Sequence, residues 1–140
     1  MATLAPSPVA SAPVAVWTGR ALSGLAVAFL VMDAGMKLAG IPAVSETATQ
    51  LGWTGDTGFW RGMGGLLLAC TLLYAWPRTA LLGAVLLTGY LGGAIATHVR
   101  AGSPLFSHVL FGLYLALFVW GGLWLRSPEL RALLPLVTKD

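Results

Sequence analysis

Two ionisable residues inside an apolar segment are the first candidates for chemistry in this sequence. Asp33 and Lys37 interrupt a hydrophobic stretch that begins at Ala21. On a helix, a spacing of four residues puts both side chains on one face, about 6 Å apart along the axis. A carboxylate beside an ammonium group in apolar surroundings suits acid–base work. We therefore consider Asp33 a candidate proton donor or acceptor, with Lys37 tuning it.

Five further residues could complete a catalytic or ligand-binding site with this pair. His98 could assist proton transfer, and Thr97 lies next to it in the sequence. Arg61 and Arg100 could bind a carboxylate, a phosphate or a lipid head group through two hydrogen bonds. Trp60 could stack on a flat ligand. Simpler roles stay open: a hydrogen-bonded interfacial histidine, arginines that extend to the membrane surface, and a tryptophan that anchors a helix there.

Few residues in the chain could hold a metal or a cofactor. Cys70 is the only cysteine, so the chain can form neither an internal disulfide nor a redox-active cysteine pair. There are two histidines, His98 and His108, and no glycine motif for binding a nucleotide. We expect neither a stoichiometric metal nor a flavin, with haem bound through one of the histidines as the alternative to be tested.

The composition indicates a membrane protein. Of the 140 residues, 57% are hydrophobic and 9% are charged, and the mean hydropathy is +0.82. A soluble domain carries roughly 25% charged residues, so most of this surface must face lipid. The net charge of +3 comes from scattered basic residues with no interleaved aromatic residues, which argues against nucleic-acid binding.

The spacing of charges predicts an all-α bundle of four transmembrane helices. Residues 79–99 and 101–125 are free of charge and long enough, at about 1.5 Å per residue, to cross roughly 30 Å of hydrocarbon. The first span must include Asp33 and Lys37 to be long enough, and Gly40-Ile41-Pro42 should end it. The four helices are expected at approximately 18–40, 60–76, 78–100 and 104–125, with Ser103-Pro104 as the cap and first turn of the last.

The remaining segments are expected to lie outside the spans. Residues 1–16 contain three prolines and no basic residue, which predicts a disordered arm before a single domain over 17–140. A polar segment at 45–50 could form a short interfacial or re-entrant helix, and 52–58 a loop. Ser127-Pro128-Glu129 indicates the start of a surface helix that reaches about residue 136. Glycines at 89 and 93 are expected to pack the third span against a neighbour.

Four spans place both termini on one side of the membrane. That side carries five basic residues and the other side three, which favours cytoplasmic termini. The five are Arg20, Arg78, Arg126, Arg131 and Lys139, and the three are Lys37, Arg61 and Arg100. The candidate site residues then gather at the outer end of the bundle.

Three segments resemble the DoxX-like family of small bacterial membrane proteins. They are Met32-Asp-Ala-Gly-Met-Lys-Leu38, Leu51-Gly-Trp53, and the stretch from Leu87 to Arg100 that contains Thr97 and His98. The similarity runs from about Ala21 to Pro135 and implies a four-helix bundle in a bacterial inner membrane. The family name comes from a subunit of a quinone-linked thiosulfate-oxidising complex, and other relatives are described as membrane components of redox systems.

The resemblance leaves the reaction open. Relatives with thiol chemistry carry cysteine pairs, which this chain lacks. We therefore expect a protein of the lipid bilayer that binds a lipophilic molecule, a quinone or a lipid, within a redox system and with a redox partner protein. The alternative is a non-catalytic subunit or carrier whose buried charges fix helix register. The sequence does not decide whether the protein is an enzyme, nor its oligomeric state.

Overall fold

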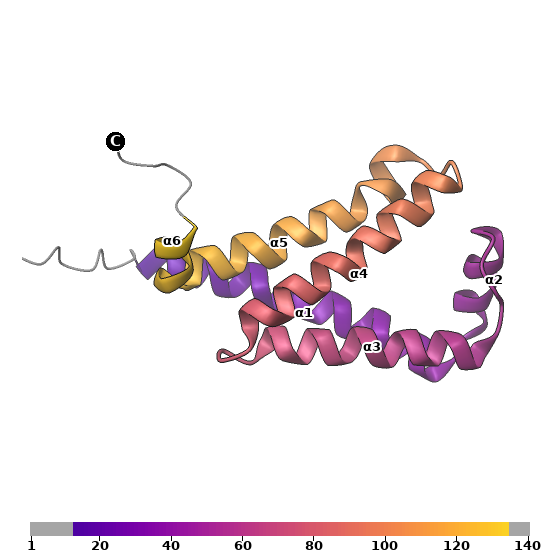
Figure 1. The fold of residues 1–140 in the computed structure, drawn as a ribbon, viewed down its shortest axis with the longest axis horizontal. Helices are drawn as coiled ribbons and strands as arrows, with labels where there is room; N and C mark the ends of the chain where they lie inside the picture. The colour runs from indigo at the N-terminus through magenta and orange to yellow at the C-terminus, as the bar shows by residue number, and fades with distance from the viewer. Residues whose placement is uncertain (1–12, 135–140) are drawn as a thin grey trace, which may run out of the picture.

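The computed structural model describes residues 13–134, and this part of the chain is helical without any strand, as predicted. Figure 1 shows the order of the elements. The helices are α1 (Pro13–Ala39), α2 (Pro42–Gln50), α3 (Thr57–Ala75), α4 (Ala80–Arg100), a π-helical turn η1 (Leu105–Val109), α5 (Phe111–Arg126) and α6 (Pro128–Leu133).

The four longest helices form a ring in which α1 packs on α3 and α5, and α4 packs on the same two helices. Glycines allow the closest approaches. A Cβ on Gly83 would overlap the backbone of Tyr74, where α3 turns into α4, and one on Gly122 would overlap Ser23 of α1. The fully buried Tyr74 hydroxyl donates to the Val119 carbonyl at 2.7 Å and accepts from the Ser23 hydroxyl at 2.8 Å. This chain of bonds joins α1, α3 and α5.

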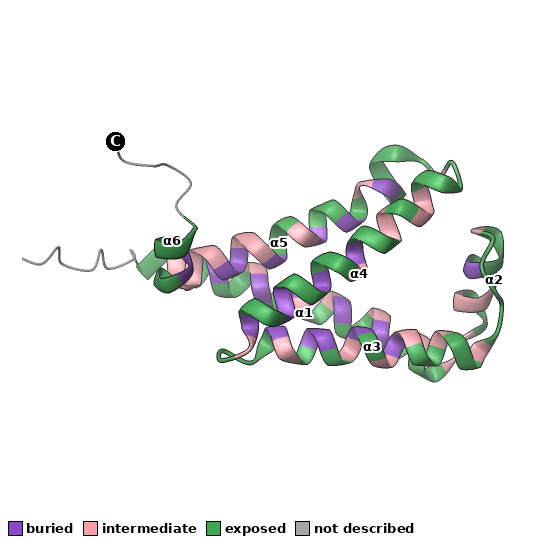
Figure 2. Cartoon of the chain, in the orientation of Figure 1, coloured by how far each residue is buried: buried purple, intermediate pink, exposed green. Residues whose placement is uncertain are grey.

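The outward faces of the long helices are apolar. Large exposed hydrophobic side chains include Leu25 on α1, Leu72 on α3, Leu82 on α4 and Leu117 on α5. Figure 2 shows buried and exposed residues alternating along each of these helices, so that each has one buried and one exposed side. Three segments are long and apolar enough to cross a membrane: Pro13–Ala39, Ala80–Arg100 and Leu105–Arg126. An apolar surface of this extent is typical of contact with lipid.

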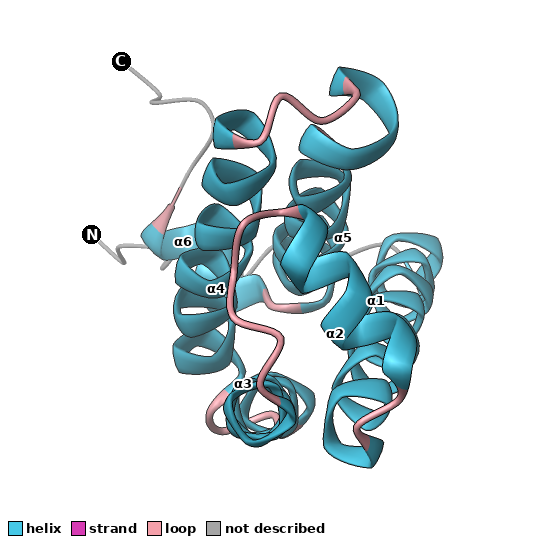
Figure 3. Ribbon diagram, turned by 90° about the vertical axis from the view of Figure 1, so that its right-hand side faces the viewer, coloured by secondary structure: helices cyan, strands magenta, loops and turns pink. Residues whose placement is uncertain are grey.

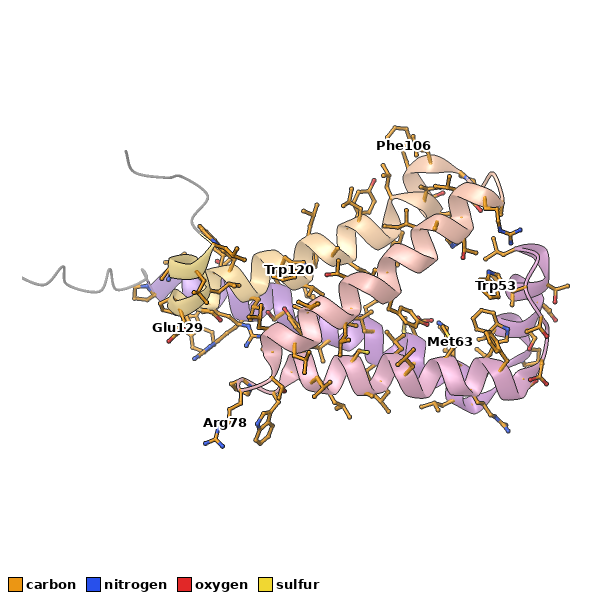
Figure 4. All side chains as sticks on the ribbon, viewed as in Figure 1. Trp53, Met63, Arg78, Phe106, Trp120 and Glu129 are labelled. Atoms are coloured by element: carbon orange, nitrogen blue, oxygen red, sulfur yellow. The ribbon has the colours of Figure 1, made fainter. Side chains whose placement is uncertain are left out.

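The bundle has two different ends. At one, α2 lies beyond the ends of α3 and α4, and we call this the α2 end. At the other, the start of α1 lies near α6, and we call this the α6 end. Figure 4 shows Trp53 and Met63 toward the α2 end and Arg78 and Glu129 at the α6 end.

The turn from α1 into α2 follows the predicted signals. Gly40 has φ +68°, a left-handed conformation that favours glycine and ends α1. Pro42 occupies the first turn of α2, where the amide hydrogen that a proline lacks would have no partner within the helix. The polar segment at 45–50 is therefore helical. The loop after it is shorter than predicted, because Asp56 caps α3 by accepting from the Phe59 amide at 2.7 Å.

The predicted start of the last span is wrong in detail. Ser103 does not cap it; its hydroxyl lies 3.0 Å from His98 Nδ1 instead. Pro104 precedes the helix, and the first turn is π-helical, with the amides of Val109 and Leu110 bonded five residues back. A proline removes one amide donor and so loosens the first turn.

The first and last residues of the described part differ slightly from expectation. Residues 1–12 of the predicted arm lie outside the described part, but residues 13–16 form the first turn of α1. A proline is tolerated there because the first amides of a helix have no partner. The helix predicted after Ser127 is α6, but it ends at Leu133, earlier than expected, because Leu134 is not helical; residues 135 and 136 are not described.

The prediction for Gly89 and Gly93 is not met within the described chain. A Cβ on either glycine would have no neighbour within 4 Å in residues 13–134. Gly64 and Gly122 make the close helix contacts instead. Small-residue spacing alone does not reveal which side of a helix faces a neighbour.

Candidate functional site

A cavity of about 820 Å³ lies at the α2 end, between α1, α2, α3, α4 and the start of α5. Its walls are mainly apolar and aromatic, and this size falls in the usual range for small-molecule sites. The aromatic lining residues are Phe29, Trp53, Phe59, Trp60, Tyr90 and Phe111. Besides the phenol of Tyr90, the polar or ionisable lining side chains are Asp33, Lys37, Thr47, Cys70, Thr97, His98 and His108.

The Asp33–Lys37 pair lies on the cavity wall. Lys37 Nζ donates to Asp33 Oδ1 at 2.5 Å, one turn apart on α1, and the two side chains are 13% and 26% exposed, Lys37 the less. No other side-chain hydrogen bond to either residue occurs in the described part of the chain. One carboxylate oxygen and two ammonium hydrogens therefore remain for a ligand.

Close packing of α1 against α3 fixes the position of Lys37. A Cβ on Gly64 of α3 would lie 2.7 Å from Lys37 Cβ and 2.9 Å from the Ala34 carbonyl oxygen. The backbones of α1 and α3 thus touch behind the lysine. The absence of a side chain at Gly64 therefore leaves room for the Lys37 Cβ, and the lysine side chain lines the cavity.

Two histidines face each other across the α4–η1 turn. The rings of His98 and His108 have centroids 5.6 Å apart. Nδ1 of each ring lies near a serine hydroxyl, Ser103 for His98 at 3.0 Å and Ser107 for His108 at 2.7 Å. These bonds orient the rings and leave both Nε2 atoms without a partner among the described residues. No group of three metal-ligating side chains occurs in that part of the chain.

Trp60 belongs to an aromatic cluster that covers the α2 end. Its ring makes edge-to-face contacts with Trp53, at 6.3 Å between centroids, and with Phe59, at 5.2 Å. Its indole nitrogen donates to the Thr54 carbonyl at 2.7 Å. The polar atom of Trp60 is therefore used within the protein, and only its apolar ring is available to a ligand.

Arg61 and Arg100 do not line the cavity. Arg61 is exposed and lies against the turn at Gly40. Arg100 Nη2 donates to the Leu51 carbonyl at 2.6 Å and so ties the end of α2 to the end of α4. In Figure 3, α2 and the loop after it lie across the ends of the long helices. The structure therefore brings five of the seven predicted residues to the cavity and leaves these two arginines outside it.

The cavity has an opening between α3 and α4. These helices touch at their connecting turn and diverge toward the α2 end (Figure 1). Cavity-lining residues along both are exposed, which indicates that the cavity is open here: Leu66 on α3 is 53% exposed and Leu86 on α4 is 42% exposed, with Gly89 and Gly93 also exposed. The opening lies on the apolar side of the bundle.

Tyr90 was not among the predicted site residues, and His108 was considered only as a haem or metal ligand. Tyr90 lines the cavity and is half-buried, with no hydrogen bond from its hydroxyl in the described chain. Tyr90 and Thr97 are seven residues apart, which is two helical turns, so they share a face. That spacing could have identified the tyrosine. His108 was expected near this end of the bundle, but its contact with His98 depends on the π-helical turn that follows Pro104.

The cavity and its lining residues lie in a part of the chain that matches a known protein family. The model of the DoxX-like family matches residues 21–122. The chain belongs to the DoxX-like family. The matched region includes every cavity-lining residue and ends four residues before Arg126. With its membrane-spanning helices, this DoxX-like chain is an integral membrane protein. No curated protein and no solved structure matches it.

Proposed function

We propose that this DoxX-like protein binds a lipophilic molecule, a quinone or a lipid, in the cavity at the α2 end. The observation that carries the proposal is one cavity that joins an aromatic wall to the Asp33–Lys37 pair. A ligand with an apolar body and a polar head would satisfy both parts.

The polar groups suit a head that both accepts and donates hydrogen bonds. Lys37 would donate to a ligand oxygen and Asp33 would accept from a ligand hydroxyl. Tyr90, His98 and His108 also line the cavity, from α4 and η1. A quinone ring with its two oxygens fits these requirements, and His98 would assist any proton transfer.

The lateral opening supports a ligand that arrives from the bilayer. The exposed lining residues at the opening are leucines and glycines. A water-soluble substrate would gain nothing from such an entrance, whereas a lipid or quinone tail could lie in it. Gly89 and Gly93, which pack no helix here, keep this passage open.

We further infer that α3 is the fourth span. It packs between α1 and α4 and carries exposed Leu66 and Leu72. Its 19 residues would cover about 28 Å, close to the hydrocarbon thickness. With the distribution of basic residues, this gives a bacterial inner-membrane protein with cytoplasmic termini and the cavity in the outer half. We also propose a role within a redox system, with a redox partner protein, which the family resemblance supports.

A non-catalytic subunit or carrier is the second candidate. It is favoured by the use of several polar atoms within the protein, such as the Trp60 indole nitrogen and the Arg100 guanidinium. Against a purely structural role, the Asp33–Lys37 bond lies within one helix and cannot fix the register of two helices.

The test fills the cavity from a position that tolerates a side chain. Gly93→Leu would place a leucine at the opening, where a Cβ meets no described atom within 4 Å. Gly92→Leu is the matched control, since Gly92 is equally open but does not line the cavity. Each variant is purified in mild detergent and examined by native mass spectrometry, with bound molecules extracted and identified.

The proposal predicts a lipophilic molecule in the wild type and in Gly92→Leu and its loss in Gly93→Leu. Equal retention in both variants would contradict the proposed cavity. Co-purification of a soluble oxidoreductase with no bound small molecule in any sample would favour the non-catalytic subunit.

A further inference from the structure

A second, smaller pocket lies at the α6 end, far from the cavity described above. Its volume is about 200 Å³, and it is formed by α1, α3 and the end of α5. Arg20 and Arg126 line it together with Ser23, Gly24, Val27 and Tyr74. It is smaller than the roughly 300–1,000 Å³ of a pocket that encloses a whole ligand, so it could hold a head group only.

Packing positions Arg126 at this pocket. The backbones of α1 and α5 touch at Gly19, whose Cβ would lie 2.9 Å from the Arg126 amide nitrogen. The guanidinium lies 5.4 Å from the centre of the Tyr74 ring, and Nη2 makes a long bond of 3.5 Å to the Tyr74 carbonyl. Nε is buried and has no hydrogen-bond partner among the described residues.

The positive charge of the pocket has no compensating carboxylate within the described chain. The single ion pair found there is Asp33–Lys37, at the other end of the bundle. Glu129 lies at the α6 end (Figure 4) but is exposed and pairs with neither arginine. Arg20 packs over the Trp17 ring at 5.0 Å. A bound anion would compensate the charge of this half-buried guanidinium and accept a hydrogen bond from its unpaired donor.

The pocket changes from polar to apolar along α1. Arg20 and Ser23 form its polar part, and Gly24 and Val27, one and two turns further along, form its apolar part. A Cβ on Gly24 would meet nothing within 4 Å in residues 13–134, so the helix surface is open there. A free anion needs only the arginines, whereas a lipid would also use this open apolar strip.

We propose that this pocket binds an anionic phospholipid, with its phosphate between Arg20 and Arg126 and an acyl chain along Gly24 and Val27. Basic pockets between helices at the cytoplasmic surface are a recurring way to hold such head groups. The shared chemistry is a phosphate group, which inorganic phosphate could also supply. The site is independent of the ligand proposed for the α2 end.

The experiment compares probes and two pairs of matched variants. Purified full-length protein in mild detergent receives phosphatidylglycerol, phosphatidylcholine or inorganic phosphate, and bound lipid is counted by native mass spectrometry beside the melting temperature. Arg20→Gln removes one pocket charge, and Arg78→Gln removes an exposed arginine at the same end that does not line the pocket. Gly24→Leu covers the apolar strip, and Gly35→Leu adds the same side chain to α1 at another open position.

The proposal predicts that phosphatidylglycerol binds in preference to phosphatidylcholine. Arg20→Gln should weaken its binding about fivefold, the usual effect of one basic residue near an anionic lipid, and Gly24→Leu should weaken it at least as much. Both controls should bind as the wild type does. Equal binding by Arg20→Gln and Arg78→Gln would overturn the site. If inorganic phosphate stabilises the wild type and Gly24→Leu equally, and no lipid is retained, the proposal that the bound anion is a lipid is overturned.

Discussion

Lys37 and Asp33 bond to each other within one turn of α1, with 2.5 Å between Nζ and Oδ1, and both border the large cavity. An ion pair that holds two helices together would link different helices, and this one does not. Two charges in one membrane span are costly, at about 2.5–3.5 kcal/mol each on insertion scales. Their mutual bond offsets part of that cost and leaves hydrogen-bonding capacity toward the cavity.

The turn between α3 and α4 should be intolerant of any side chain at Gly83. Gly83→Ala would force its methyl group into the Tyr74 backbone, which cannot move aside as a side chain could. Overpacking of this kind costs about 1–3 kcal/mol or more, so we expect a clearly lower melting temperature in detergent. Gly92→Ala, on the same helix with an open Cβ position, should be neutral or stabilising by up to about 1 kcal/mol. Equal melting temperatures would contradict the described turn.

The α2 segment should open more often when Arg100 is replaced. Two glycines with positive φ flank α2, Gly40 at +68° and Gly52 at +77°, and Ala48 is its only buried residue. Arg100→Gln would remove the bond to the Leu51 carbonyl. Loss of a charged hydrogen bond of about 1.5 kcal/mol predicts roughly tenfold faster hydrogen exchange in α2, with little change in global stability.

Arg61→Gln serves as the control for this experiment. Arg61 is an exposed arginine at the same end, and its guanidinium makes no hydrogen bond to any described residue. Its replacement should leave exchange in α2 unchanged. Equal acceleration by both substitutions would mean that net charge, rather than the Arg100 bond, holds α2 in place.

Much of the fold could be predicted because lipid constrains a helical sequence strongly. Charge-free stretches located α4 and the segment from η1 to α5 to within two residues, and Gly40-Ile41-Pro42 marked the end of α1 correctly. The pairing of Asp33 with Lys37 followed from helical spacing alone. All of these features depend on residues close together in the sequence.

The rest depended on contacts between distant segments. Arg100 was predicted to bind a ligand, but α2 folds back and offers it a carbonyl group. The contact between His98 and His108 could be found only once α4 and η1 were placed side by side at one cavity. The roles of Gly89 and Gly93 were misjudged because helix rotation is set by all neighbours together.

The orientation of the bundle can be tested with single cysteines. Cys70 is buried, so it should contribute little background labelling. With cytoplasmic termini, Thr54→Cys, in the loop after α2, should react with an impermeant thiol reagent added to whole cells. Ala132→Cys on the exposed side of α6 should react only after the cells are opened. The opposite pattern would invert the topology and place the large cavity toward the cytoplasm.

Cofactor content can be read from absorption spectra and elemental analysis of the purified protein. We expect no stoichiometric metal and no flavin, since the sequence offers two histidines and one cysteine. Haem would have to use His98 or His108. A Soret band at one haem per chain that disappears in His98→Ala would contradict this expectation and assign the histidine pair to haem ligation.

The most direct test of the central claim replaces the Asp33–Lys37 pair. Each single variant, Asp33→Leu or Lys37→Met, leaves one charge without its partner. This should lower the free energy of unfolding by about 1–3 kcal/mol, less than the roughly 3–5 kcal/mol expected when a fully buried pair is broken. The double variant removes both charges and should recover stability. Melting temperature and ligand retention are measured together on all three. The account predicts a double variant that is as stable as the wild type but retains no lipophilic ligand. A stable double variant that keeps its ligand would contradict it and make the pair structural.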